Sequence, residues 1–351
     1  MDAHIQSVLM QGSEGIIIEI ECQLSNSLPS IVIVGLGNKA VDEAKDRIRS
    51  AFTSAGISLP RKRITINLAP ADIPKDSTSL DLAIAAAIIM SNQAQQRPPK
   101  NQAIIGEIGL TGAVRPVRGI IGKLLAGKKL GIDHFFIPAG NLSQAALVPD
   151  VTLQPVQDIK QMYLAFNNEG GFPLPVDNST STIVPHVEQG SALSYIAGQT
   201  QAKRALEIAA SGGHNILLSG PPGTGKSMLA KALPSLLPPL THQEMLEVTH
   251  LHSLASSTYD QLVVSRPFRA PHHSSSHISI VGGGYSARPG ELALSNHGVL
   301  FLDEMPEFSR ITLEALRQPL EDRIITVARA RHVMEYPANF ILVATANPCP
   351  C

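Results

Sequence analysis

The sequence predicts an α/β protein of two domains joined by a polar linker, with an open parallel sheet in the second domain. Three observations predict it. Short β-branched runs alternate with helical patterns through residues 1–166, which is typical of one domain that mixes strands and helices. In residues 167–190, fourteen of the 24 are Gly, Pro, Ser, Thr, Asn or Asp, a composition that cannot build a core. Residues 191–351 then begin with helix, strand, glycine loop and helix, the start of a doubly wound sheet.

Composition excludes several classes of protein. The 351 residues are 44% hydrophobic and 16% charged, so the chain is not disordered. Its formal charge is only −1, which means that a nucleic acid would have to be bound through local patches. The longest apolar run, Ala83 to Met90, is too short for a membrane span, the N-terminus lacks a signal sequence, and the three cysteines make no disulfide framework. We therefore expect a cytoplasmic protein with no membrane partner.

The elements of the first domain follow from β-branched runs and helical periodicity. Helical spacing of apolar residues is clearest in residues 39–55, where Ala44, Ile48 and Ala51 share a face. The patterns predict strands over 15–22, 31–35, 62–68, 103–107 and 134–138, and helices over 39–55, 79–91 and 120–130.

A phosphate-binding loop opens the second domain. The pattern G-x-x-x-x-G-K-[ST] is matched in full by Gly220, Pro221, Pro222, Gly223, Thr224, Gly225, Lys226 and Ser227. The glycines let backbone N–H groups face phosphate oxygens, and the following helix adds its positive end. Lys226 would bind the β- and γ-phosphates, and the Ser227 hydroxyl would ligate Mg²⁺. A strand before the loop and a helix after it favour this interpretation over a chance glycine-rich turn, so we expect ATP and Mg²⁺ as cofactors.

Two later strands end in polar residues. Residues 298–304 form a buried strand that would deliver Asp303 and Glu304 to the carboxyl edge of the sheet. Asp303 would hold the magnesium shell, and Glu304 would polarise the attacking water. The strand over 340–347 ends in Asn347, whose amide can hydrogen-bond the γ-phosphate or the water. We predict catalytic roles for Glu304, Lys226 and Asn347.

Together, the loop, the Asp-Glu strand and the terminal Asn resemble the core of an AAA+ ATPase. Longer segments narrow the resemblance, among them Arg-Pro-Phe-Arg-Ala-Pro-His-His at 266–273 and Pro-Gly-Glu-Leu-Ala-Leu-Ser-Asn-His-Gly at 289–298. They look like the magnesium-chelatase-like branch of AAA+ and, within it, the ComM/YifB group linked to natural competence. The resemblance covers nearly the whole chain. It implies an ATP hydrolase that assembles into a homo-oligomeric, hexamer-like ring.

The same resemblance implies a DNA partner. Members of this branch carry two β-hairpins that face the channel of the ring, here over about 278–296 and over 323–337. Arg329, Arg331 and His332 on the second hairpin would then contact a phosphate backbone, although two arginines on a hairpin are equally compatible with a solvated face. The implied function is a DNA-remodelling motor of the branch-migration type in natural transformation and recombination.

Residues 70–90 and 106–125 resemble the Lon-peptidase fold, so residues 1–166 are expected to form a Lon-protease-like (ribosomal S5 domain 2-like) α+β domain. Ser79 stands at the nucleophile position, but Ile121 stands where the Lon family has its lysine. Lys123, two residues later, is expected to point elsewhere on a helix. A serine without a base is a weak nucleophile. We therefore expect a non-proteolytic domain that serves assembly or partner binding.

An AAA+ core normally continues past its terminal Asn with a further strand, a helical lid and an arginine finger. Only four residues follow Asn347. The resemblance thus implies an incomplete core over 191–351 that lacks its lid, with weak or absent turnover by this chain alone. Two alternatives stay open. One is a metal-chelatase-like ATPase subunit, against which the fused first domain argues, and the other is a nucleotide-binding module that does not hydrolyse ATP.

Overall fold

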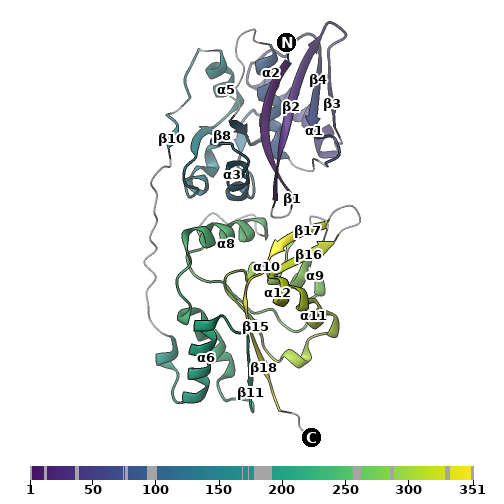
Figure 1. Ribbon diagram of the computed structural model, residues 1–351. Helices are drawn as coiled ribbons and strands as arrows, with labels where there is room; N and C mark the ends of the chain where they lie inside the picture. The colour runs from purple at the N-terminus through teal and green to yellow at the C-terminus, as the bar shows by residue number, and fades with distance from the viewer. Residues whose placement is uncertain are drawn as a thin grey trace. The chain divides into compact units, whose positions relative to one another are not determined.

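The computed structural model divides into two compact units, Met1–Ser181 and Thr182–Cys351 (Figure 1). The boundary between them lies within the range 167–190 that was expected to be a linker, although Val176–Asp177 in that range forms a short strand. The structure describes residues 2–11, 14–35, 39–73, 75, 78–92, 101–167, 169–172, 174–177, 192–255, 262–284, 288–328 and 333–348.

The first unit is built on an eight-stranded mixed sheet in the order β10-β9-β8-β5-β1-β2-β4-β3. Its strands are β1 (Asp2–Gln11), β2 (Glu14–Ser25), β3 (Ser30–Val34), β4 (Arg63–Ala69), β5 (Gln102–Ile104), β8 (His134–Pro138), β9 (Thr152–Val156) and β10 (Val176–Asp177), with β6 (Glu107–Ile108) and β7 (Val114–Arg115) in a separate pair. Its helices are α1 (Lys39–Ser54), α2 (Asp81–Ser91), α3 (Ile120–Lys129), α4 (Leu142–Ala145) and α5 (Ile159–Phe166). Strand β2 pairs in antiparallel fashion with both β1 and β4. On either side of these three strands, β1 pairs in parallel with β5 and β4 pairs in parallel with β3.

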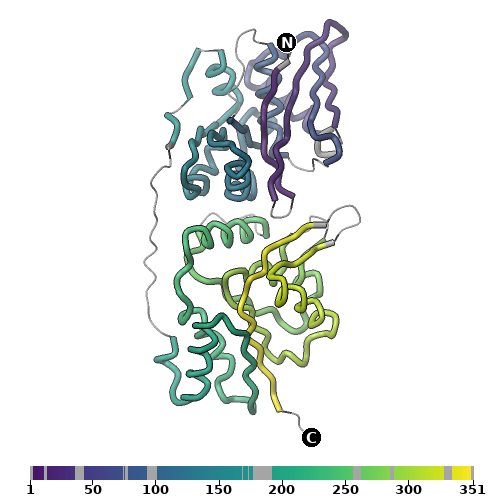
Figure 2. The backbone as a smooth tube through the Cα atoms, viewed as in Figure 1, coloured from purple at the N-terminus to yellow at the C-terminus, as the bar shows by residue number. Residues whose placement is uncertain are grey.

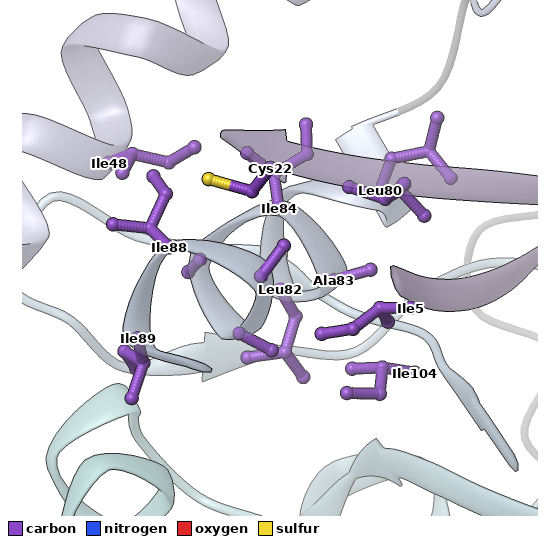
Figure 3. Close-up of a cluster of buried hydrophobic side chains, with 14 of the residues drawn as sticks. Ile5, Cys22, Ile48, Leu80, Leu82, Ala83, Ile84, Ile88, Ile89 and Ile104 are labelled. Carbon is purple, nitrogen blue, oxygen red and sulfur yellow. The ribbon is translucent and has the colours of Figure 1, made fainter. Parts of the chain in front are cut away.

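The core of the first unit is organised around α2. All eleven residues of this helix are buried, as expected for a helix that is apolar on every side. Figure 3 shows Leu82, Ile84 and Ile88 among side chains from neighbouring elements, including Ile48 of α1. Because alanines fill much of the helix surface, neighbouring backbones can approach it closely.

Replacing Ile84 with valine is expected to lower the free energy of unfolding by about 1 kcal/mol, because removing one methylene from a close-packed core leaves a small cavity. Ile84 is 1% exposed. Denaturant titration followed by circular dichroism measures the change. Ile208→Val removes the same group where the side chain is 52% exposed, and it should cost less than about 0.5 kcal/mol. Equal costs at the two positions would contradict the packing described.

The second unit is built on a four-stranded, all-parallel sheet in the order β11-β18-β15-β12. Figure 2 traces the chain through it. The sheet strands are β11 (Ile216–Ser219), β12 (Phe268–Arg269), β15 (Val299–Leu302) and β18 (Ile341–Ala346), and two antiparallel hairpins pair β13 (Gly282–Gly283) with β14 (Arg288–Pro289) and β16 (Ile324–Ala328) with β17 (Val333–Pro337). The helices are α6 (Thr200–Gly212), α7 (Lys226–Ala232), α8 (His242–Ala255), α9 (His277–Val281), α10 (Glu291–Leu294), α11 (Arg310–Ala315) and α12 (Arg317–Asp322). The expected parallel-sheet core is therefore confirmed.

Three elements differ from the sequence-based expectation. Strand β1 was not predicted, although Ala3, Ile5, Ser7 and Leu9 are buried at the period of two that is typical of a strand; Val8 is buried as well. The helix expected after the phosphate loop is short: α7 ends at Ala232, because Pro234 lies in the 3-10 turn Leu233–Leu236 that follows it. The first expected hairpin, 278–296, is a pair of two-residue strands flanked by α9 and α10.

Candidate nucleotide-binding site

The phosphate loop joins the end of β11 to the start of α7. Gly223 and Gly225 both have φ of +82°, in the left-handed region that favours glycine. Gly225 is the N-cap of α7, so the N–H groups of the first helical turn begin directly after the loop. The loop therefore has the backbone conformation that its glycine spacing predicted.

The ammonium group of Lys226 lies across this loop. Lys226 Nζ donates hydrogen bonds to the carbonyl oxygens of Gly220, at 2.7 Å, and Pro221, at 2.9 Å. It also donates to Asn347 Oδ1 at 3.1 Å. Two residues that are 121 positions apart in the sequence thus meet at the carboxyl edge of the sheet.

The expected magnesium ligands are also in contact. Ser227 Oγ donates a hydrogen bond to Asp303 Oδ2 at 3.1 Å. Asp303 directly follows β15. In the sheet, β18 lies between β11 and β15 and pairs with β15. One carboxylate and one hydroxyl are a typical protein contribution to Mg²⁺, which keeps its remaining positions for water and phosphate oxygens.

Glu304 adopts an uncommon backbone conformation beside this pair. Its φ is +54°, which is costly for a residue with a side chain and requires support from its surroundings. The Glu304 N–H donates to Thr345 Oγ1 at 2.8 Å, and Glu304 Oε1 accepts from Asn347 Nδ2 at 3.2 Å. The carboxylate is therefore linked to the residue that also binds Lys226.

Sequence reasoning missed Thr345. This threonine is 1% exposed and donates to Asp303 Oδ1 at 2.6 Å while it accepts from the Glu304 N–H. One hydroxyl thus orients the proposed metal ligand and the backbone of the proposed water-binding residue. The available signal was a single hydroxyl within the apolar run of β18, two residues before Asn347.

Replacing Thr345 with valine is expected to raise the Mg²⁺ concentration for half-maximal ATP binding about tenfold. Valine keeps the shape but loses the hydrogen bond to Asp303, and one such bond to a charged group is worth about 1.5 kcal/mol. Titration of a fluorescent ATP analogue with Mg²⁺ measures the shift. Thr249→Val is the matched control, because Thr249 is also buried and also makes two hydrogen bonds, to Met245 O and from Val263 N. A tenfold shift in both variants would contradict a specific role for Thr345.

Polar contacts within the second unit are formed by the two long segments that carry the family resemblance, residues 266–273 and 289–298. Arg269 donates twice to the Glu291 carboxylate, at 2.5 and 2.7 Å, and so ties β12 to α10. Arg266 Nη1 donates to the carbonyl of His297 at 2.7 Å. His297 in turn contacts Glu244 and Glu247 of α8 at 3.3 and 2.9 Å. These residues stabilise the connections between sheet and helices.

The predicted DNA-contact residues lie outside the described part of the chain. The hairpin expected over 323–337 is present as β16 and β17. Arg329, Arg331 and His332 fall between those strands in residues 329–332, which are not described. Within the described ranges, no group of three or more His, Cys, Asp or Glu side chains is arranged to hold a metal ion.

The expectation about Lys123 was wrong. Lys123 Nζ lies 3.2 Å from Ser79 Oγ, within hydrogen-bonding distance. Helical spacing alone predicts that Lys123 points away, because residues two apart on a helix do not share a face. Both Ile121 and Lys123 are nevertheless buried, because nearly the whole circumference of the first turns of α3 is covered by protein. The Lys123 side chain can therefore point in a different direction from Ile121 and still be buried in protein rather than exposed to solvent.

The parallel order β11-β18-β15-β12, with a phosphate loop after β11, defines a P-loop nucleotide-binding core of the AAA+ class. Residues 192–351 match the family model described as magnesium chelatase, subunit ChlI, and residues 20–141 match the model for subunit ChlI of Mg-chelatase. In the described residues, every helix is too short or too polar to span a bilayer.

Relatives that are longer than this chain identify the branch of the AAA+ class to which it belongs. The chain is 44% identical over 352 residues to an uncharacterized protein of Mycobacterium tuberculosis, 42% identical over 351 residues to competence protein ComM of Haemophilus influenzae, and 43% identical over 335 residues to the uncharacterized protein YifB of Escherichia coli. These matches cover 98%, 99% and 95% of this chain and 69%, 69% and 65% of the relatives. The chain belongs to the magnesium-chelatase-like ComM/YifB family. It is also 29% identical to the Lon protease of Elusimicrobium minutum over 147 residues, which cover 40% of this chain and 17% of that protease.

Proposed function

We propose that the second unit binds and hydrolyses Mg·ATP, and that the protein uses this cycle to remodel branched DNA. The observation that carries the ATPase part is the hydrogen-bonded series from Ser227 through Asp303 and Thr345 to the backbone of Glu304. It joins the phosphate loop to the ends of two other strands, where phosphoryl transfer needs both a metal ligand and a residue that positions water.

Each residue of this series has a chemical role in the proposal. The loop backbone and Lys226 bind the β- and γ-phosphates, and Ser227 and Asp303 hold the magnesium ion, which neutralises charge on the phosphate oxygens when bound. Glu304 orients the water for in-line attack on the γ-phosphate. Asn347, which contacts both Lys226 and Glu304, links the state of the phosphate to the position of that carboxylate.

The DNA part of the proposal rests on three observations of different kinds. The Haemophilus relative is named a competence protein. The sequence places Arg329, Arg331 and His332 between the two strands of the β16–β17 hairpin. In the first unit, residues 61–63 are Arg, Lys and Arg, and all three are exposed. Because the net charge is only −1, such local patches would supply the contacts to phosphate. Since AAA+ proteins of this family are typically oligomeric, we propose that the working form is a homo-oligomeric ring.

Steady-state ATP hydrolysis with and without four-way DNA tests the proposal. It is measured on the chain and on a version extended beyond residue 351 by an AAA+ lid. In the extended version we expect DNA to stimulate hydrolysis, Lys226→Ala to abolish it, and Arg329→Ala/Arg331→Ala to remove only the response to DNA. The chain by itself should show weak or absent turnover. Arg204→Ala/Arg317→Ala, at two exposed helical positions, is the charge-matched control. Hydrolysis that never responds to DNA would contradict the proposed DNA-remodelling function. Mg·ATP binding without hydrolysis in both versions would favour a nucleotide-binding module that does not hydrolyse ATP.

A second candidate function is an ATPase subunit of the chelatase type, which would couple ATP hydrolysis to the insertion of Mg²⁺ into a porphyrin. The match of residues 192–351 to the magnesium chelatase family model favours it. Stimulation of hydrolysis by a porphyrin, with no response to four-way DNA, would support this alternative over the DNA motor.

A further inference from the structure

A small cavity lies in the first unit where the C-terminal ends of α1, α2 and α5 meet. Its volume is about 100 Å³. Ser58 and Asn92 line it and are exposed, so the cavity opens to solvent. A closed apolar cavity of about 150 Å³ holds a benzene ring. A smaller site that is open on one side therefore has room for one six-membered ring, but not for two fused rings.

The walls of the cavity are aromatic and aliphatic. Phe52 of α1 is buried, as are Ile88 and Ile89 near the end of α2 (Figure 3). Tyr163 of α5 is partly buried and adds a second aromatic side chain. Walls of this kind suit a flat ring, because nucleic-acid bases stack on aromatic side chains and pack against apolar ones.

Two asparagines bring amide groups to the same cavity. Asn92 is the C-cap of α2, and Asn167 is the C-cap of α5. An amide side chain both donates and accepts hydrogen bonds, which matches the donors and acceptors on the edge of a pyrimidine base. Because helix C-termini carry partial negative charge, an anion inside the cavity is disfavoured. The chemistry of the site therefore favours a neutral, polar, single ring.

Three cationic residues follow the cavity wall directly in the sequence. Pro60 lines the cavity, and Arg61, Lys62 and Arg63 come next and are all exposed. In the described part of the chain, no carboxylate is paired with any of the three. Consecutive Cα atoms are about 3.8 Å apart, so these charges begin close to the cavity. Exposed cations in this position suit the phosphates that flank a bound base.

We propose that the cavity binds one pyrimidine base of an unpaired DNA strand, while residues 61–63 bind the phosphates beside it. The base enters between the ends of α1, α2 and α5, and the strand continues over the surface of the first unit. This site rests on the proposed function, because remodelling of branched DNA presents unpaired bases to the protein. It assigns the first unit a direct part in holding the substrate.

Binding of short single-stranded oligonucleotides to the full chain tests this site. A thymidine oligomer is compared with an abasic oligomer of the same length, which keeps the phosphates and lacks the bases, and fluorescence anisotropy gives both Kd values. We expect the abasic oligomer to bind about tenfold more weakly, because stacking of one base contributes a factor of this size. Tyr163→Leu should bring the two Kd values to within about twofold, since the stacking partner is lost. Tyr195→Leu, at a tyrosine that is 86% exposed and outside the cavity, should keep the tenfold difference.

Salt dependence tests the cationic residues. For single-stranded DNA, the logarithm of the binding constant falls with the logarithm of the salt concentration, with a slope of about −0.7 for each phosphate contact. Arg61→Ala/Lys62→Ala should therefore make the slope for the thymidine oligomer shallower by about 1.4. Arg204→Ala/Arg317→Ala removes the same charge from two exposed helical positions and should leave the slope unchanged.

Photo-crosslinking answers the same question without a variant, should Tyr163→Leu fail to fold. An oligomer that carries 5-iodouracil is irradiated with the unchanged protein, and peptide mass spectrometry locates the attached residue, which we expect to be Tyr163. Equal Kd values for the thymidine and abasic oligomers, or attachment confined to residues outside the cavity, would overturn the proposal. ATP hydrolysis with four-way DNA is measured on the same samples. Base binding that depends on Tyr163, without stimulation of hydrolysis by DNA, would contradict the remodelling function and support this site.

Discussion

Replacing Lys226 with alanine is expected to raise the Kd for Mg·ATP about 100-fold. Lys226 Nζ lies against the loop carbonyls of Gly220 and Pro221 and against Asn347, so its charge is concentrated where the β- and γ-phosphates would bind. A hydrogen bond between an ammonium ion and a phosphate is worth up to about 3 kcal/mol, and 100-fold corresponds to about 2.7 kcal/mol. Equilibrium titration with a fluorescent ATP analogue measures Kd without requiring turnover.

Lys231→Ala is the matched control for this measurement. Lys231 is an exposed lysine in the last turn of the same helix, α7, and removing it changes the net charge by the same amount. Its Kd should stay within about twofold of the unchanged protein, because exposed charges are well screened by salt. If Lys226→Ala bound Mg·ATP as tightly as Lys231→Ala, the loop would not be the phosphate site.

Replacing Lys123 with methionine is expected to remove a rise in the free energy of unfolding between pH 8 and pH 10.5. Burial lowers the pKa of Lys123 from 10.5 to about 8 in the folded protein. Between these values the unfolded chain binds one more proton than the folded chain, so stability increases with pH by about 1.4 kcal/mol per unit. The whole rise amounts to about 3 kcal/mol. Below pH 8 Lys123 is protonated in both the folded and the unfolded chain, and the free-energy cost of burying its charge is present in full.

Urea unfolding of both proteins at a series of pH values measures this difference. The two stability curves should converge or cross as the pH rises, since methionine has nothing to titrate. Lys128→Met in the same helix removes an amine that binds Asp150 at the protein surface, and this variant should keep the rise. Lys75 also has a pKa lowered by burial, but it is common to all three proteins and cancels in the comparison. A parallel pair of curves for Lys123→Met and the unchanged protein would refute the shifted pKa.

The arrangement of side chains at the candidate nucleotide site was largely predictable because these residues occur in contiguous motifs. Lys226 and Ser227 follow the glycines of the loop directly, and Asp303 and Glu304 end an apolar strand. Carboxyl ends of parallel strands meet at one edge of a sheet, so strand identity was enough to bring these residues together. Thr345 was missed because its hydroxyl matters only through two contacts, with Asp303 and with the Glu304 N–H, that depend on the register between β15 and β18.

The Ser79–Lys123 pair could not be predicted from helical spacing. That spacing says which side chains share a face of α3, but not how much of the helix surface other elements cover. Packing of α3 against β1 and β2 buries positions that a surface helix would expose, and Val8 supplies the second acceptor for the lysine.

By itself, the sequence determined that the chain has two α/β domains and that the second contains a phosphate loop, because local periodicity and short motifs encode both. Only the tertiary structure decided that β1 joins the middle of the first sheet, that Thr345 links Asp303 to Glu304, and that Lys123 reaches Ser79. The physical reason is the same in each case. Strand pairing, burial and the depression of a lysine pKa depend on neighbours distant in the chain, and no local pattern records which neighbours those are.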